Sequence, residues 1–312
     1  MNGAVRSRPN GGARFVDPRV LARIDRLDLI ARTVVDGFMA GLHPSPHLGL
    51  STDFAEHRPY MPGDDVRRVD WRLYGRTDRL YLKEFEAETN ADVLLLIDIS
   101  ASMDWGAGQG AGTDAVTKLD YGRYLAACLA YFSHRQRDRI GVVTFDRDVV
   151  DQTPASGRQL DTVLHTLDRI VPGGAGELAG PLKRIAKGLR RRGIVVLMSD
   201  LYEDPEGVAR AAAQLALAGH DLIVFHLLDR RELDFDFPTP RQFEDAESGE
   251  RIPVIPDRIR DGYQGLMRHH IDRIAARLGE LRVEYCQVDT AKPLDHALYD
   301  YLARRQRLQR VR

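Results

Sequence analysis

Hydrophobic and polar positions follow two alternating patterns along this chain. Apolar runs occupy residues 93–97, 194–198 and 222–228, the last of them interrupted only by His226, and runs of this length are typical of strands buried in a parallel sheet. Between them, apolar side chains recur every three or four positions, which indicates helices with one buried face. This order predicts an α/β fold with a doubly wound, mostly parallel sheet. The other elements expected are helices near 119–135, 161–170, 181–189, 206–218 and 263–278, a terminal helix, and strands near 139–145 and 282–288.

The part of the chain before this sheet has a different character. Residues 1–14 are rich in Gly, Arg and Asn and are predicted to be disordered. Asp17-Pro18 has the form of a helix N-cap followed by a first-turn proline, which predicts a helix to about Gly41. Residues 15–90 are therefore expected to hold an N-terminal helix and a small charged, loop-rich extension. Residues 91–300 are expected to form the α/β domain.

Three polar segments of the second half of the chain call for their own interpretation. Residues 239–256 predict a hairpin insertion that turns at Ser248-Gly249. Residues 190–192 are three arginines that are expected to end a helix, where positive charge complements the helix dipole. Residues 301–312 form a basic C-terminal tail, interpreted as a solvated helix end, with docking of an acidic partner or nucleic acid as the alternative.

Composition excludes some classes of function. The 312 residues are 43% hydrophobic, enough for a full core, and 45 Lys and Arg balance 46 Asp and Glu. A net charge of −1 gives no overall attraction to nucleic acid or to an anionic membrane, so a partner must be recognised through a local patch. No segment reaches the roughly 18 to 20 apolar residues of a membrane span. Two cysteines without metal-ligand spacing indicate a reducing compartment, and a cytoplasmic location is expected.

The most informative chemistry follows the first buried strand. Asp98-Ile-Ser100-Ala-Ser102 comes directly after the run at 93–97, and side chains at the carboxyl end of a parallel strand can converge in the crevice above the sheet. Oxygen ligands gathered there suit Mg²⁺ or Mn²⁺. The arrangement resembles the metal-ion-dependent adhesion site of von Willebrand factor A (vWA) domains, whose first loop carries Asp-x-Ser-x-Ser.

The vWA resemblance implies further ligands. In that family a threonine from a second loop and an aspartate from a third complete the protein ligands, and an acidic residue of a partner often takes the last position. Asp200, which ends the segment Ile194-Val-Val-Leu-Met-Ser-Asp200, matches the third loop. The second loop fails to match, because residues 173–178 carry no threonine. Water or the neighbouring Glu177 could replace it, so the alternatives are a weak or partner-dependent divalent site and a metal-free remnant.

A second motif lies upstream, between Phe54 and Glu88. Tyr60-Met-Pro-Gly-Asp-Asp65 and Arg67-Arg-Val-Asp-Trp71 closely resemble the signature of the bacterial DUF58 family, which precedes a vWA-like segment. The resemblance covers roughly residues 20 to 300. It implies a partner of MoxR-type AAA+ ATPases. The block itself is interpreted as an ion-paired scaffold with Trp71 packed inside, and its candidate partner-binding residues are Arg58, Asp64, Asp65 and Arg72.

Three functions compete on this basis. The first is a non-enzymatic interaction module that uses a divalent ion at Asp98, Ser100, Ser102 and Asp200, with Glu177 as a further ligand, to bind an acidic side chain of the ATPase or of its client. The second is an aspartate-nucleophile phosphohydrolase similar to haloacid dehalogenases, in which the expected general acid is missing because Ser100 takes its place. The third is a metal-free scaffold that binds through residues 58–76.

Overall fold

The structure is a computed structural model, and it describes residues 17–24, 26–42, 56–60, 69, 71–84, 91–106, 116–246 and 249–310. The predicted disordered segment 1–14 lies outside these residues, as do Asp64 and Asp65.

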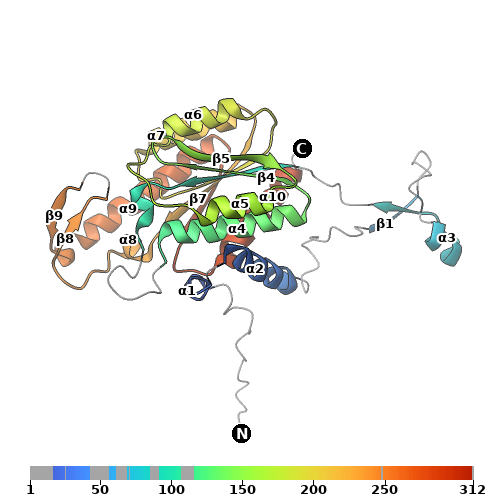
Figure 1. Cartoon of the computed structure of the whole chain (residues 1–312), viewed down its shortest axis with the longest axis horizontal. Coiled ribbons are helices and arrows are strands. Elements are labelled where there is room, and N and C mark those ends of the chain that lie inside the picture. The colour runs from blue at the N-terminus through green and yellow to red at the C-terminus, as the bar shows by residue number, and fades with distance from the viewer. Residues whose placement is uncertain are drawn as a thin grey trace, which may run out of the picture.

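A six-stranded sheet forms the centre of the molecule (Figure 1). Its strand order is β10-β7-β6-β3-β4-β5, in which every pairing is parallel except that of β5 with β4. The predicted doubly wound, mostly parallel α/β fold is therefore confirmed. The strands are β3 (Asp92–Asp98), β4 (Arg139–Phe145), β5 (Val149–Ser156), β6 (Ile194–Ser199), β7 (Asp221–Leu228) and β10 (Glu284–Asp289).

Each strand divides its side chains between two cores because successive residues point to opposite faces of a sheet. Val93, Leu95 and Ile97 of β3 join one core, while Leu94 and Leu96 join the other. The first core is covered by α2 (Leu27–Leu42), α4 (Lys118–Arg135), α5 (Leu160–Asp168) and α10 (Leu294–Arg310), and the second by α6 (Ala179–Gly188), α7 (Pro205–Leu217) and α9 (Pro256–Glu280). Figure 1 shows α6 and α7 above the sheet and α4, α5 and α2 below it.

The N-terminal helix is shorter than predicted. Asp17 does cap α1 (Pro18–Leu21), and its side chain accepts a hydrogen bond from the backbone N–H of Arg19. The helix stops there, however, and α2 begins only at Leu27. The apolar face that was predicted for one long helix is divided between the two, since Leu21 of α1 and Ile30 and Val34 of α2 are all buried in the first core.

The small extension and the hairpin insertion both appear in the structure. β1 (Glu56–Pro59) pairs antiparallel with β2 (Tyr81–Glu84), and α3 (Trp71–Thr77) lies between them in sequence. Trp71 was expected to be packed inside, but it is 58% exposed and contacts Tyr74 ring edge to ring face. The hairpin is confirmed, with β8 (Arg241–Glu244) paired to β9 (Arg251–Val254) and a positive φ of 73° at Gly249.

The basic C-terminal segment differs from the predicted solvated tail. α10 continues to Arg310, and Arg305 is 3% exposed. The Arg305 guanidinium forms an ion pair of 2.5 Å with Asp138, which is also buried. Arg304 pairs with Glu284 of β10 at 2.6 Å. Arg304 and Arg305 of this segment are therefore docked on the domain.

Candidate functional site

The carboxyl ends of β3 and β6 lie side by side and carry the predicted ligands. Ile97 is opposite Met198 in the parallel register, so the next residues, Asp98 and Ser199, are neighbours. Asp98, Ser100 and Asp200 are all buried, at 5%, 1% and 2% exposure. We call the site formed by Asp98, Ser100, Ser102 and Asp200 the Asp98 crevice.

Two uncharged groups hold the Asp98 carboxylate. The backbone N–H of Ser100 donates to Oδ1 at 2.9 Å, and the Ser199 hydroxyl donates to Oδ2 at 2.6 Å. The first bond is a local turn in which an aspartate accepts from the backbone two residues on. It turns the chain back after β3 and leads into the short 3₁₀ turn η3 (Ala101–Asp104). As a result, the hydroxyl oxygens of Ser100 and Ser102 lie 3.2 Å apart.

The second loop reaches the same place, although it lacks the threonine. The N–H of Ala101 donates to the carbonyl of Gly174 at 2.8 Å, and the N–H of Gly173 donates to the carbonyl of Ile99 at 2.5 Å. A Cβ at position 173 would lie 2.6 Å from a carboxylate oxygen of Asp146, which explains the glycine. Glu177 is exposed, and its carboxylate makes no hydrogen bond or ion pair within the described residues. The role of Glu177 as a further ligand therefore stays a prediction.

A buried lysine enters the crevice, and it is absent from the ligand set predicted from the sequence. The Lys118 ammonium is 2.8 Å from Oδ2 of Asp200 and 2.7 Å from Oε1 of Glu232, with its side chain fully buried. Glu232 belongs to α8 (Arg230–Asp234) and caps it by accepting from the backbone N–H of Asp229. The face of the Tyr202 ring covers the ammonium at 4.7 Å. We call Asp200, Lys118 and Glu232 the ion triad.

One signal in the sequence could have identified Lys118. It is the first residue of α4, directly after the N-cap Thr117, whose hydroxyl forms a capping box with Asp120. A positive charge in the first turn of a helix opposes the helix dipole. A lysine there requires compensation from acidic groups elsewhere in the fold, which here are Asp200 and Glu232.

Burial sets the electrostatics of the crevice. Loss of hydration, and then the negative charge of Asp200, raise the pKa of Asp98 to about 7. Burial alone would lower the pKa of Lys118, but Asp200 and Glu232 together raise it above its ordinary value. Lys118 is thus a permanent cation that balances Asp200, while Asp98 has no cation as a direct partner among the described residues.

The donor set of the crevice fits a hard divalent ion in part. Asp98, Ser100 and Ser102 present a carboxylate and two adjacent hydroxyls, which are the oxygen ligands that Mg²⁺ and Mn²⁺ accept. Asp200 fits less well because one of its oxygens is already bound to Lys118. No group of three or more His, Cys, Asp or Glu side chains with metal-binding geometry occurs in the described residues. A divalent ion would thus depend on the serine hydroxyls.

The candidate partner-binding residues of the extension are only partly placed. Arg58 lies in β1, opposite Leu82 of β2, and Arg72 lies in the first turn of α3. Asp64 and Asp65 fall outside the described residues. The predicted role of these four residues remains a prediction.

Residues 56–273 match a family model with the description "Protein of unknown function DUF58". An uncharacterized protein of Mycobacterium tuberculosis, Rv1480, is 30% identical over 238 residues, which cover 75% of this chain and 73% of the relative. The uncharacterized protein Mb1516 of Mycobacterium bovis matches to the same extent. The chain belongs to the DUF58 family, as its two upstream motifs predict.

Solved structures with a similar chain path share little sequence with this protein. BatB of Bacteroides thetaiotaomicron is 15% identical with a TM-score of 0.48, and 70% of this chain covers 99% of that one. The SpRpn10 VWA domain is 12% identical with a TM-score of 0.36, and 66% of this chain covers 92% of it. Among the helices of the described residues, none combines the length and the apolar character needed to cross a bilayer.

Proposed function

We propose that this chain is a protein-interaction module that recognises its partner at the Asp98 crevice. A divalent ion, Mg²⁺ or Mn²⁺, would be held there by Asp98, Ser100 and Ser102 and would leave one position for an acidic side chain of the partner. The observation that carries this proposal is the buried Asp98 carboxylate, which accepts hydrogen bonds from Ser100 and Ser199 but contacts no cation in the described structure. A buried carboxylate in that situation gains most from a cation.

The ion triad supports a weak site rather than a strong one. The ammonium of Lys118 already neutralises Asp200, so a divalent ion would gain attraction mainly from one carboxylate, that of Asp98. The missing threonine removes one protein ligand more. An acidic side chain from a partner would supply the second negative charge, and metal and partner would then bind more tightly together than either does alone.

The partner that we propose is a MoxR-type AAA+ ATPase or a client of that ATPase. Support for this identity comes from the DUF58 motifs at residues 60–71. The nearly neutral chain, with a net charge of −1, supports recognition through a local site rather than through overall charge.

A thermal titration tests the metal site directly. Mg²⁺ or Mn²⁺ is added to the wild type, to Asp98→Asn and to the control Asp161→Asn, which removes an exposed carboxylate from the first turn of α5. The unfolding midpoint is expected to rise with metal in the wild type and the control but not in Asp98→Asn. A wild type that does not respond, or an equal response in Asp98→Asn, would exclude the metal site.

Capture of the partner tests the interaction. The immobilised chain is expected to retain a purified MoxR-type ATPase from its own genome in Mg²⁺, and to lose it in EDTA or with Asp98→Asn. Equal capture under all three conditions would favour the metal-free scaffold that binds through residues 58–76. Hydrolysis of p-nitrophenyl phosphate that disappears in Asp98→Asn would instead favour the phosphohydrolase.

A further inference from the structure

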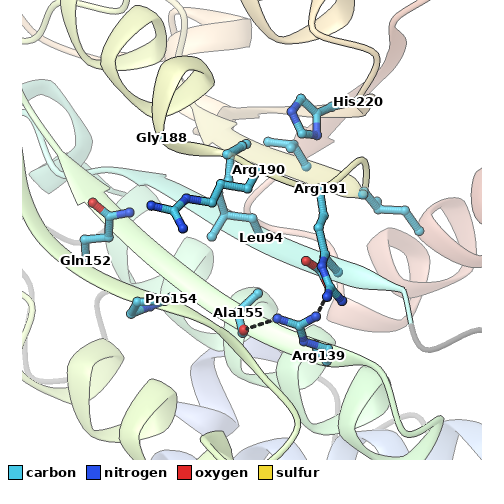
Figure 2. A pocket seen from close by; sticks show the side chains of 14 residues that line it. Leu94, Arg139, Gln152, Pro154, Ala155, Gly188, Arg190, Arg191 and His220 are labelled. Atoms are coloured by element: carbon cyan, nitrogen blue, oxygen red, sulfur yellow. Dashed lines mark hydrogen bonds and ion pairs between the residues drawn. The ribbon is translucent and has the colours of Figure 1, made fainter.

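A second concave site lies at the opposite end of the sheet, where the parallel strands begin. It has a cavity volume of about 430 Å³ and is bounded by the starts of β3, β4 and β6, by β5, and by the loop after α6. Figure 2 shows Arg139, Arg190 and Arg191 extending across it, with Leu94 on the floor. We call this site the arginine groove. A volume of this size lies within the range of ligand-binding pockets.

The local sequence explains why the groove stays open. α6 ends at Gly188, Leu189 is extended, and three arginines then turn the chain into β6. Gly193 follows directly, and a Cβ at this position would meet the carbonyl oxygen of Asp92 at 2.3 Å. The loop is therefore pressed against the start of β3, and the side chains of Arg190 and Arg191 are directed over the neighbouring strands (Figure 2).

The arginines of the groove differ in their partners. Arg139 is part of the fold, because it pairs with Asp92 at 3.3 Å and donates to the carbonyl of Ala155 at 3.1 Å. Arg190 and Arg191 are exposed, and neither has an acidic partner within 4 Å in the described structure. The groove thus presents two guanidinium groups whose charge the domain does not neutralise.

The helix dipole does not account for both of these charges. Its effect is confined to the last turn of a helix, and α6 ends two residues before Arg190. The floor between the arginines is apolar, with Leu94, Pro154 and Val195 among its lining residues. His220 also lines the groove at 7% exposure, and its Nδ1 has no hydrogen-bond partner among the residues that the structure describes. Ligand-binding sites typically combine an apolar surface with a small number of polar or charged groups. The arginine groove has this composition, with an apolar floor, two arginines at its rim and the Nδ1 of His220.

We propose that the arginine groove binds an acidic peptide segment of a partner protein. Carboxylates of the segment pair with the guanidinium groups of Arg190 and Arg191, whose planar fork matches a carboxylate with two parallel hydrogen bonds. An apolar side chain between the carboxylates packs on Leu94 and Pro154. Pro154 of the edge strand β5 lacks a backbone donor, so the segment docks through its side chains and does not extend the sheet.

A synthetic probe tests this site without knowledge of the natural partner. The probe is a fluorescein-labelled peptide of sequence Glu-Leu-Glu-Glu-Leu-Glu, followed by fluorescence anisotropy at low salt. The wild type is expected to bind it, and to bind a peptide with Gln in place of every Glu at least about tenfold more weakly, a difference of about 1.4 kcal/mol. Affinity should also fall as salt is added, because the rim arginines are exposed to solvent.

Two charge-reversal variants locate the binding. Arg190→Glu combined with Arg191→Glu is expected to reduce the affinity at least about tenfold. Arg169→Glu combined with Arg258→Glu changes the net charge equally at exposed positions outside the groove, and it should bind as the wild type does. Circular dichroism checks that each variant is folded, and the milder Arg190→Gln with Arg191→Gln replaces the first pair if it is not.

Three results would overturn the proposal. The first is equal binding of the acidic and the Gln peptide. The second is an equal loss in both charge-reversal variants, which would indicate attraction by net charge alone. The third is displacement of the probe by inorganic pyrophosphate at the concentration at which the unlabelled acidic peptide displaces it, which would indicate a simple anion site without use of the apolar floor.

Discussion

Lys118 is the residue on which the electrostatics of the crevice depend. It lies fully buried between Asp200 of the sheet edge and Glu232 of α8. Removing one member of a buried ion cluster leaves the remaining charges without compensation. The loss of stability is then much larger than when the whole cluster is replaced by well-packed apolar residues. Lys118 therefore links two segments of the chain that would otherwise repel each other, since Asp200 and Glu232 are both acidic.

Lys118→Met is expected to lower the free energy of unfolding by about 3 to 5 kcal/mol in the absence of divalent ions. Adding Glu232→Gln to this variant should restore part of the loss, because one unpaired carboxylate is removed. The measurement is urea unfolding, with Lys183→Met on the exposed face of α6 as the control.

The same variant also tests the role of Asp200. Without Lys118, both carboxylate oxygens of Asp200 are available, and Mg²⁺ should raise the unfolding midpoint more in Lys118→Met than in the wild type. An equal rise in both proteins would show that Asp200 is beyond reach of the ion.

His226 connects the crevice to the interior of the sheet. Its Nε2 lies 2.7 Å from the carbonyl oxygen of Asp200 and its Nδ1 lies 2.8 Å from the hydroxyl of Tyr285. A carbonyl can only accept, so Nε2 carries the proton and Nδ1 accepts from Tyr285. Burial lowers the pKa of His226 to about 3, with Asp200 acting in the opposite direction and His270 and Lys118 adding to the decrease.

This depressed pKa predicts a dependence of stability on pH. The unfolded chain takes up a proton at position 226 near pH 6.5, the ordinary value, whereas the folded chain does so only near pH 3. Between these limits the unfolded state binds more protons, so the free energy of unfolding falls as the pH falls. The contribution is about 1.4 kcal/mol for each pH unit between about 6 and 4.

Nuclear magnetic resonance of the histidine ring protons can isolate this group. The peak that disappears in His226→Gln is expected to keep its chemical shift from pH 8 to pH 4.5 in the wild type. The fall in stability between pH 6 and pH 4 should be smaller in His226→Gln. A titration of that peak near pH 6.5 would contradict the buried neutral state.

At the scale of elements, the hydrophobic pattern predicted the strands that are buried on both faces of the sheet. It missed the strand that is partly exposed. β3, β6 and β7 were predicted closely because their apolar runs have no competing interpretation. β5 was not predicted, since it lies at the sheet edge, exposes half of its residues and contains Asp151, Gln152 and Pro154. Such a strand is specified by its pairing with β4, which is a property of the fold and not of its own composition.

The C-terminal helix α10 illustrates a second limit. Its arginines were expected to be solvated because arginine is almost never fully buried unless it is paired. Arg305 is paired, and its partner Asp138 precedes β4 and also accepts from the backbone N–H of Ala91. A contact between residues 167 positions apart leaves no pattern in the local sequence of either.

This ion pair predicts that α10 is essential for the stability of the domain. Arg305→Met should lower the free energy of unfolding by about 3 to 5 kcal/mol, because Asp138 stays buried without its cation. Arg304→Met at the neighbouring position, where the pair with Glu284 is more exposed, should cost about 1 kcal/mol or less. Urea unfolding of both variants gives the comparison.

The double variant Arg305→Met with Asp138→Asn separates the two explanations of such a loss. If the unpaired carboxylate is the cause, this variant should be more stable than Arg305→Met alone. A further decrease in stability would show that packing of the arginine side chain, and not its charge, holds α10 in place.

At the scale of the whole molecule, the α/β architecture and the edge of the sheet that carries the Asp98 crevice both follow from the sequence. One strand ends at Asp98 and the other ends directly before Asp200, so the two residues must reach the same edge if the strands are parallel neighbours. The charge state of the crevice does not follow, because Lys118 comes from α4 and Glu232 from beyond β7. The arginine groove likewise combines residues from four strands and two loops, and the sequence shows only a run of three arginines.

The two sites lie at opposite ends of β3, and this separation predicts that they act independently. Leu94 of the groove floor and Asp98 of the crevice are four residues apart on one extended strand, or about 13 Å. Sites at this distance without shared partners are usually additive to about 0.5 kcal/mol. Asp98→Asn should therefore leave the affinity for the acidic peptide unchanged, and the Arg190→Glu with Arg191→Glu variant should keep its thermal response to Mg²⁺.

The triple variant that combines these changes completes the test. It is expected to show the peptide affinity of the groove variant and the metal response of the crevice variant, with a coupling free energy near zero. A coupling well above 0.5 kcal/mol would mean that β3 transmits a change between its two ends. In that case a partner bound at one end of the sheet would alter the affinity of the other end, and the module would bind its two ligands as a coordinated pair.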